Sequence, residues 1–163
     1  MSMRVLLSVC MLSLLCGRIV EAEPYLEEVL TLSQSSKLIA GCESYAQENE
    51  LAPLTMAVYD AAGNLKQFVR QDGAMLLSAE FAHIKGRTAA MSGLATSELA
   101  AIEFENKEQP LGIRYVRDLT VVQGGVAVAS ISGKHLGGFG VSGAPAEQDE
   151  ACGDAGVASM QGK

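Results

Sequence analysis

The chain is poor in the residues that form metal and redox sites. Its two histidines, His83 and His135, are far apart in the sequence, and neither belongs to an H-E-x-x-H pattern. Its four cysteines include no C-x-x-C pair. A hydrolytic metal centre needs a local cluster of imidazoles and carboxylates, and a redox centre needs closely spaced thiols. The sequence therefore argues against both kinds of site.

Positive charge is also scarce, and it is not clustered. The chain has 12 Lys and Arg residues against 19 Asp and Glu residues, which leaves a formal net charge of −7. The basic residues are scattered singly along the chain. Binding to nucleic acid or to an anionic membrane surface needs concentrated positive charge. We therefore expect a small-molecule ligand and no nucleic-acid partner.

The main apolar run lies at the N-terminus. It is Val5–Cys16, preceded by Arg4 and followed by the small-residue site Val20-Glu21-Ala22. The run is too short for a bilayer, which needs about 20 apolar residues, so no stable membrane insertion is expected. This arrangement is typical of a secretory signal peptide. We expect residues 1–22 to be removed and residues 23–163 to form one periplasmic or secreted domain.

Glycine, in contrast, is abundant in the stretch Gly124–Asp149. This stretch predicts two short strands, Val126–Ile131 and Leu136–Val141, joined by a turn at Ser132-Gly133-Lys134. Pro145 follows at a position typical of the first residue of a helix. So much glycine indicates close approach of another part of the chain, or turns that other residues cannot form.

Two known motifs can be fitted to this stretch, but the residues that should accompany each of them are missing. Gly138–Gly143 fits G-x-G-x-x-G, but no second strand follows, and no acidic residue lies about 20 positions further on. Ser142 lies in a near match to G-x-S-x-G, but an α/β-hydrolase needs a histidine after its serine, and none follows. A dinucleotide-binding fold and a hydrolase are both excluded.

Capping residues and hydrophobic periodicity predict the other elements. Thr31 and Gln34 form a capping box, and the apolar stripe after them predicts a helix that ends near Asn49. Residues 115–122 fit either a loop or a strand. The other predicted elements are strands at 54–59 and 65–70, helices at 78–92 and 96–104 capped by Ser78 and Thr96, and a last helix at 146–158. Because hairpins dominate, we expect an α+β fold with an antiparallel sheet.

Four motifs in register carry a family resemblance. They are Ala57–Gly63, Arg70–Ala74, Lys85-x-x-Thr88-Ala89, and the glycine stretch that ends in Gln148-Asp149. Together they resemble the GlcG/HbpS-like family of haem-binding, or haem-degrading, domains, over about residues 30–158. The resemblance implies a profilin-like sandwich of about five strands with helices on both faces. It also implies assembly into homo-oligomers, which in this family are octamers.

The resemblance suggests which residues bind a cofactor. Its polar positions include Arg70, Asp72, Lys85 and Thr88, together with Ser142 and Gly143 before the last helix. Arg70 and Lys85 are suited to the carboxylates of a ligand such as the propionates of haem. The backbone of 142–144 would add N–H donors at a helix N-terminus. The alternative for Arg70 and Asp72 is an ion pair that closes a turn.

Haem iron needs an axial side chain, and His83 and His135 are the imidazoles available. His83 lies on the same predicted helix as Lys85, whereas His135 lies at the turn of the last hairpin. A solvated surface position is the alternative for each histidine.

Cys42 and Cys152 are the cysteines that remain after removal of residues 1–22. They lie on the first and last predicted helices. Two separate buried thiols and one disulfide are both compatible with the sequence, since an exported protein can form disulfides.

Two functions follow from this interpretation. The first is an exported haem- or tetrapyrrole-binding protein that stores, scavenges or senses its ligand. The second is an accessory enzyme or binder for a small organic acid or diol-pathway metabolite, with Lys85, Asp72 or Asp149 in acid–base roles. No nucleophile–base pair or paired-carboxylate motif is present, which favours binding over catalysis. Peroxide chemistry or haem breakdown would then belong to the haem itself.

Overall fold

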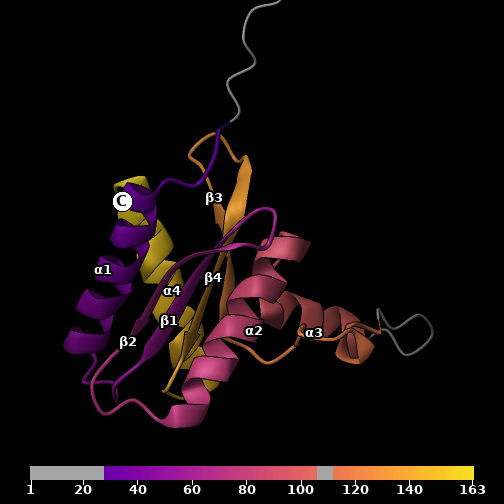
Figure 1. Cartoon of the computed structure of the whole chain (residues 1–163), viewed down its shortest axis with the longest axis horizontal. Coiled ribbons are helices and arrows are strands. Elements are labelled where there is room, and N and C mark those ends of the chain that lie inside the picture. The colour runs from indigo at the N-terminus through magenta and orange to yellow at the C-terminus, as the bar shows by residue number, and fades with distance from the viewer. Residues whose placement is uncertain (1–27, 106–111) are drawn as a thin grey trace, which may run out of the picture.

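The computed structural model describes residues 28–105 and 112–163, so the predicted signal peptide lies outside the described residues. Its centre is one antiparallel sheet in the strand order β2-β1-β4-β3 (Figure 1). The strands are β1 (Thr55–Asp60), β2 (Leu65–Arg70), β3 (Gly125–Ala129) and β4 (His135–Ser142). The predicted α+β class and antiparallel sheet are confirmed.

The expected strand count of about five is wrong, because the described residues form four strands in this sheet. Residues 115–122, which fitted either a loop or a strand, begin at the end of a 3-10 turn, Ile113–Tyr115, and continue as irregular chain. Their backbone bonds to side chains instead of a neighbouring strand. The Thr120 amide donates to Oγ1 of Thr88, and the Val122 amide donates to Oγ1 of Thr120. The two amides thus have hydrogen-bond partners without pairing to a neighbouring strand.

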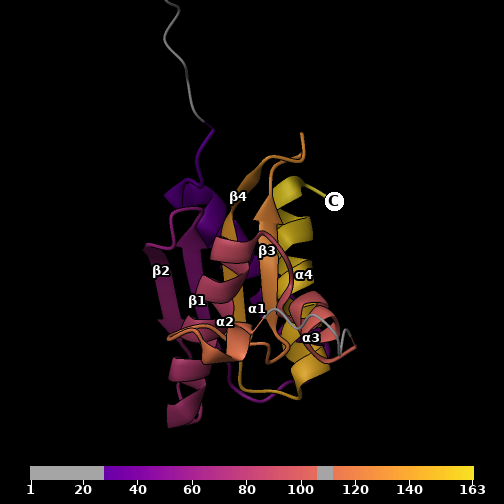
Figure 2. The ribbon, with the colours of Figure 1, turned by 90° about the vertical axis from the view of Figure 1, so that its right-hand side faces the viewer.

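Helices cover both faces of the sheet. They are α1 (Leu32–Glu48), α2 (Leu76–Ser92), α3 (Thr96–Glu105) and α4 (Ala146–Gln161). In Figures 1 and 2, α1 and α4 lie side by side on one face and α2 crosses the other, with α3 beyond it near β3. Among the described residues, no helix is both long and apolar enough to span a bilayer.

Local signals explain the start of α1 and the end of α2. The capping box of Thr31 and Gln34 forms at the start of α1, and Gly93 ends α2 in the left-handed conformation, with φ 71°. The predicted cap at Ser78 is wrong, because α2 begins at Leu76 and the Ser78 hydroxyl hydrogen-bonds back to the Met75 carbonyl.

The predicted cap at Thr96 is also wrong, because Thr96 is the first residue of α3. Its hydroxyl oxygen accepts a hydrogen bond from the Gly125 amide, 2.9 Å away. Its side chain is therefore committed to β3 and not to the first turn of its own helix.

The main core lies between the sheet and the α1–α4 layer. The largest buried side chains there include Phe139, Met56 and Leu38. Cys42 and Cys152 form a disulfide between α1 and α4 in this core, which decides the question the sequence left open.

Glycines bring α2 against the other face of β4. A Cβ atom on Gly140 would lie 2.1 Å from the Ala82 carbonyl oxygen, and one on Gly138 would lie 2.2 Å from the Ala90 nitrogen. Real Cβ atoms essentially never approach so closely, so only glycine fits at these positions. The glycine-rich strand therefore allows the backbone of α2 to pack directly on the sheet.

Candidate functional site

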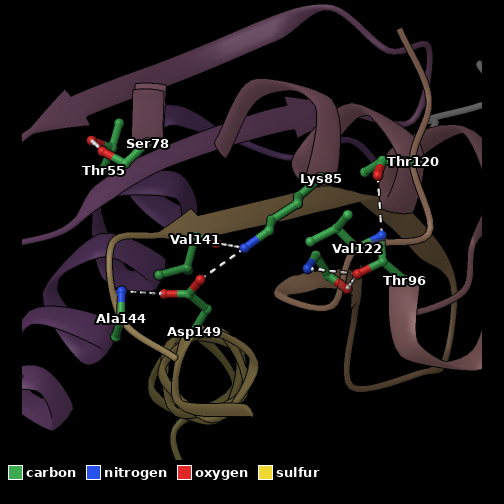
Figure 3. A network of polar contacts seen from close by, with 10 residues as sticks. Thr55, Ser78, Lys85, Thr96, Thr120, Val122, Val141, Ala144 and Asp149 are labelled. Atoms are coloured by element: carbon green, nitrogen blue, oxygen red, sulfur yellow. Dashed lines mark hydrogen bonds and ion pairs between the residues drawn. The ribbon is translucent and has the colours of Figure 1, made fainter. Parts of the chain in front are cut away.

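Lys85 is buried inside the molecule. Its residue is 2% exposed, although it lies on the helix that carries His83. Its Nζ atom lies 2.8 Å from Oδ2 of Asp149 and 3.0 Å from the carbonyl oxygen of Val141 (Figure 3). Two of its three protons are therefore engaged within the protein.

Asp149 completes this network from the first turn of α4. Its second oxygen, Oδ1, accepts a hydrogen bond of 3.0 Å from the Ala144 amide. Burial raises the pKa of Asp149, and the hydrogen bond and charge of Lys85, with the Ala144 amide, oppose that rise. The N-terminus of a helix favours an anion, and at α4 the carboxylate of Asp149 already occupies that position.

Gly124 leaves room for the meeting of Lys85 and Asp149. A Cβ atom there would lie 2.7 Å from Nζ of Lys85 and 2.8 Å from Cβ of Asp149. Its φ of +118° also favours glycine. Two of the sequence motifs, the glycine pair and the lysine, therefore meet at one buried ion pair.

The other motif residues of this region are also largely buried. Thr88 donates a hydrogen bond to the Ile84 carbonyl and accepts one from the Thr120 amide. Ser142 is 6% exposed and ends β4. Gly143 has a φ of +141°, and a Cβ atom there would lie 2.7 Å from the Pro53 carbonyl oxygen. Ser142 and Gly143 thus lead into the helix that carries Asp149.

Arg70 and Asp72 lie in the turn between β2 and α2. The Arg70 guanidinium donates a hydrogen bond to the Ala74 carbonyl, which closes this turn. The expected alternative, an Arg70–Asp72 ion pair, is wrong. Lys85–Asp149 and Arg87–Asp118 are salt bridges of the described residues, whereas Arg70 and Asp72 do not pair with each other. Asp72 itself is exposed.

His83 lies on α2 in a defined setting, in contact with one side chain from β1 and one from β2. Its Nδ1 atom is 2.7 Å from the hydroxyl oxygen of Tyr59. Its ring stacks on Phe68, with the centroids 4.6 Å apart and the planes at 4°. Nε2 has no hydrogen-bond partner among the described residues. The imidazole is therefore held on two sides, and one nitrogen is unused.

A surface hollow of about 300 Å³ adjoins this imidazole. It is lined by Tyr59, Glu80, His83, Ile84, Arg87 and Asp118. Arg87 and Asp118 lie 3.8 Å apart at partly exposed positions, so their ion pair is weak and the guanidinium can take another carboxylate. Burial raises the pKa of Tyr59, and the charge of Arg87 opposes that rise.

Sequence reasoning missed Tyr59 and Phe68 as neighbours of His83. The neighbour that it did indicate is Arg87, which lies one helical turn after His83 and therefore on the same helix face. Tyr59 and Phe68 come from two strands whose distance from α2 the sequence does not reveal.

His135 lies at the start of β4, in a different hollow of about 310 Å³. Its Nε2 atom is 2.7 Å from the Ala90 carbonyl oxygen. A carbonyl can only accept, so Nε2 carries a proton and donates it in this contact. Lys66 and Lys134 also line this hollow. No group of three or more His, Cys, Asp or Glu side chains that could hold a metal ion occurs in the described part of the chain.

The chain matches known proteins over most of its described residues. The sequence pattern of the family described as "Haem degrading protein HbpS-like" matches residues 30–158. The chain belongs to this family. A 15.0 kDa protein from the dhaT-dhaS intergenic region of Citrobacter freundii is 30% identical over 125 residues, which are 74% of this chain and 84% of that protein.

Solved structures agree with this assignment. A double mutant of Streptomyces reticuli HbpS is 29% identical with a TM-score of 0.72, over 82% of this chain and 88% of that chain. A PduOC:Heme complex is 26% identical with a TM-score of 0.71, over 81% of this chain and 95% of that chain. The second of these proteins was crystallised with haem.

Proposed function

We propose that this protein binds haem or a related tetrapyrrole and that His83 is the axial ligand. The observation that carries the proposal is the imidazole of His83, which is oriented by Tyr59 and Phe68 and has an unused Nε2 beside a hollow. Membership in the HbpS-like family and the similarity to the PduOC:Heme complex support the choice of ligand.

The residues around His83 fit such a group. The imidazole supplies a nitrogen ligand for iron, and the Ile84 side chain supplies an apolar contact. The Arg87 guanidinium supplies a cation for a propionate. When bound, the haem would supply reversible ligand binding or peroxide chemistry at its iron. The protein would orient the group and neutralise its carboxylates.

His135 fits less well as the axial ligand. Its Nε2 proton is held by the Ala90 carbonyl, which leaves Nδ1, the nitrogen nearer the backbone. His83 has its outer nitrogen, Nε2, unused.

The basic residue that pairs with the haem propionates also differs from the one expected from the sequence. Lys85 is buried and paired with Asp149, and Arg70 is bonded within its own turn. We therefore assign the main propionate contact to Arg87 and treat Arg70 as a secondary candidate. Lys85, Thr88, Ser142 and Gly143 would support the fold beneath the site.

A haemin titration of residues 23–163 tests the proposal. We expect a stoichiometric Soret band that shifts in His83→Ala and stays unchanged in the matched variant His135→Ala. Arg87→Ala should weaken binding by about 1.5–3 kcal/mol, the scale for a hydrogen bond to a charged group. A wild-type protein without a Soret change would contradict haem binding and favour the small-acid alternative.

We also propose that the protein is exported and cleaved after Ala22. The disulfide between Cys42 and Cys152 supports this, because such bonds persist in oxidising compartments. Intact-mass analysis of the exported protein should give a chain that begins at Glu23. Retention of Met1 would contradict export by a cleaved signal peptide.

A homo-oligomer is the proposed assembly state. The exposed apolar side chains of Met75, Leu76 and Leu77 at the start of α2 support it, since such surface favours burial. Sedimentation at ~50 μM should show a species larger than a monomer. A monomer alone would contradict this assembly.

A further inference from the structure

Tyr59 is the polar neighbour that reaches the inner nitrogen of His83. The phenol belongs to β1, and its oxygen lies 2.7 Å from Nδ1 of the imidazole on α2. Tyr59 is 7% exposed, and a buried phenol needs a hydrogen-bond partner. Among the described residues, His83 is the partner that the structure provides for this hydroxyl. The contact therefore links the sheet directly to the face of α2 that borders the hollow.

Two contacts together define the direction of Nε2. The stacked ring of Phe68, on β2, sets the plane of the imidazole. The Tyr59 hydroxyl sets the rotation of the imidazole within that plane. Both contacts come from paired strands, β1 and β2, and are therefore held by the sheet ladder. A side chain fixed in this way loses little conformational freedom when it binds a ligand.

The proton count then determines the role of the phenol. A neutral imidazole carries one proton, on either Nδ1 or Nε2. If Nε2 binds a ligand through its lone pair, the proton must be on Nδ1. The nearest acceptor for that proton is the hydroxyl oxygen of Tyr59, and the phenol then turns its own proton toward the hollow, which Tyr59 also lines. Polar partners of this kind fix the tautomer and orientation of metal-binding histidines.

We propose that Tyr59 is a positioning residue of the site, whose hydroxyl oxygen accepts the Nδ1 proton of His83 and keeps Nε2 unprotonated toward the hollow. This inference rests on the proposed function, in which His83 is the axial ligand. It adds a residue that touches no ligand and acts only through His83.

The first test needs no haem. The ring ¹⁵N resonances of His83 would be recorded at about pH 8.5, where imidazoles are neutral. We expect the wild-type protein to carry the proton on Nδ1, and Tyr59→Phe to shift it toward Nε2. Tyr45→Phe is the matched control, because that tyrosine is half-buried on α1 and does not contact His83. Identical His83 resonances in wild type and Tyr59→Phe would overturn the proposal.

The second test uses haemin. Tyr59→Phe should lower haemin affinity by about 10- to 100-fold, the range for removal of a hydrogen-bond partner from a metal-binding histidine, whereas Tyr45→Phe should not. In His83→Gly, added imidazole should restore the Soret shift better than 1-methylimidazole, which cannot donate to Tyr59. That difference should vanish in His83→Gly/Tyr59→Phe. Equal restoration by both compounds while Tyr59 is present would overturn the proposal.

The two tests separate the possible failures. A wild-type protein that does not bind haemin contradicts the proposed function, and the NMR experiment still decides whether Tyr59 sets the tautomer of His83. Haemin binding that is unchanged in Tyr59→Phe contradicts the positioning role alone.

Discussion

The ammonium of Lys85 and the carboxylate of Asp149 meet 2.8 Å apart in the interior, although the two residues are 64 positions apart in the chain. Their ion pair joins α2 on one side of the sheet to α4 on the other (Figure 3). Gly124 provides the space between them. Three positions of the family resemblance are thus explained by one internal contact.

Removal of one partner of this pair should be costly. Lys85→Met leaves the Asp149 carboxylate buried without its cation, which should lower the free energy of unfolding by about 3–5 kcal/mol. The double variant Lys85→Met/Asp149→Leu should recover most of that loss, because no isolated charge remains. Urea denaturation at neutral pH measures both. Equal destabilisation of the single and double variants would contradict this account.

The space at Gly124 can be tested against a matched glycine. Gly124→Ala should be more destabilising than Gly133→Ala, although both positions have positive φ. Alanine at Gly133 meets no atom within 4 Å, so its cost is the left-handed backbone alone, about 1–2 kcal/mol. Alanine at Gly124 adds a collision with Lys85, for which overpacking adds about 1–3 kcal/mol. Equal losses in thermal unfolding would show that the contact is unimportant.

The disulfide should contribute strongly to stability. It joins Cys42 and Cys152, which are 110 positions apart, so it restricts the unfolded chain over most of the domain. Cys42→Ala/Cys152→Ala should lower the free energy of unfolding by about 2–5 kcal/mol. A reductant should destabilise the wild-type protein in the same denaturation experiment and leave the variant unchanged. Destabilisation of the variant by reductant would contradict the assignment.

Stability should depend on pH through Asp154. Burial, and then the charges of Glu150 and Glu98, raise the pKa of this carboxyl. The folded state therefore binds the proton more tightly than the unfolded state. The resulting stabilisation is present below the ordinary aspartate pKa of about 3.9 and is lost as the pH rises through the raised value.

Asp154→Asn should therefore raise the free energy of unfolding at neutral pH and have little effect under acidic conditions. The gain should shrink with added salt, because Asp154 is exposed and its interactions with Glu150 and Glu98 are screened. Asp72→Asn is the control, since Asp72 is an exposed residue in a turn. Destabilisation by Asp154→Asn at neutral pH would contradict the expected sign.

The features that the sequence determined are those that depend on near neighbours. The capping box at Thr31, the strand Leu65–Arg70 and the end of α2 at Gly93 were predicted at their observed positions. Each needs only the conformational preferences of residues within one turn or one strand. The predicted cap at Ser78 failed because its hydroxyl also bonds Thr55, a distant residue whose position no local rule contains.

The tertiary structure alone decided how the chemically important side chains are used. Lys85 is a cation within one of the family motifs, which suggested that it binds a ligand. In the structure, the space beside Gly124 lets it pair with Asp149 instead. From the sequence alone, His83 could not be distinguished from a surface histidine. In the structure, β1 and β2 place Tyr59 and Phe68 against it. These contacts join residues from 15 to 64 positions apart. Their formation depends on the order of strands in the sheet and on the distance at which glycine lets α2 pack, and neither is encoded within one element.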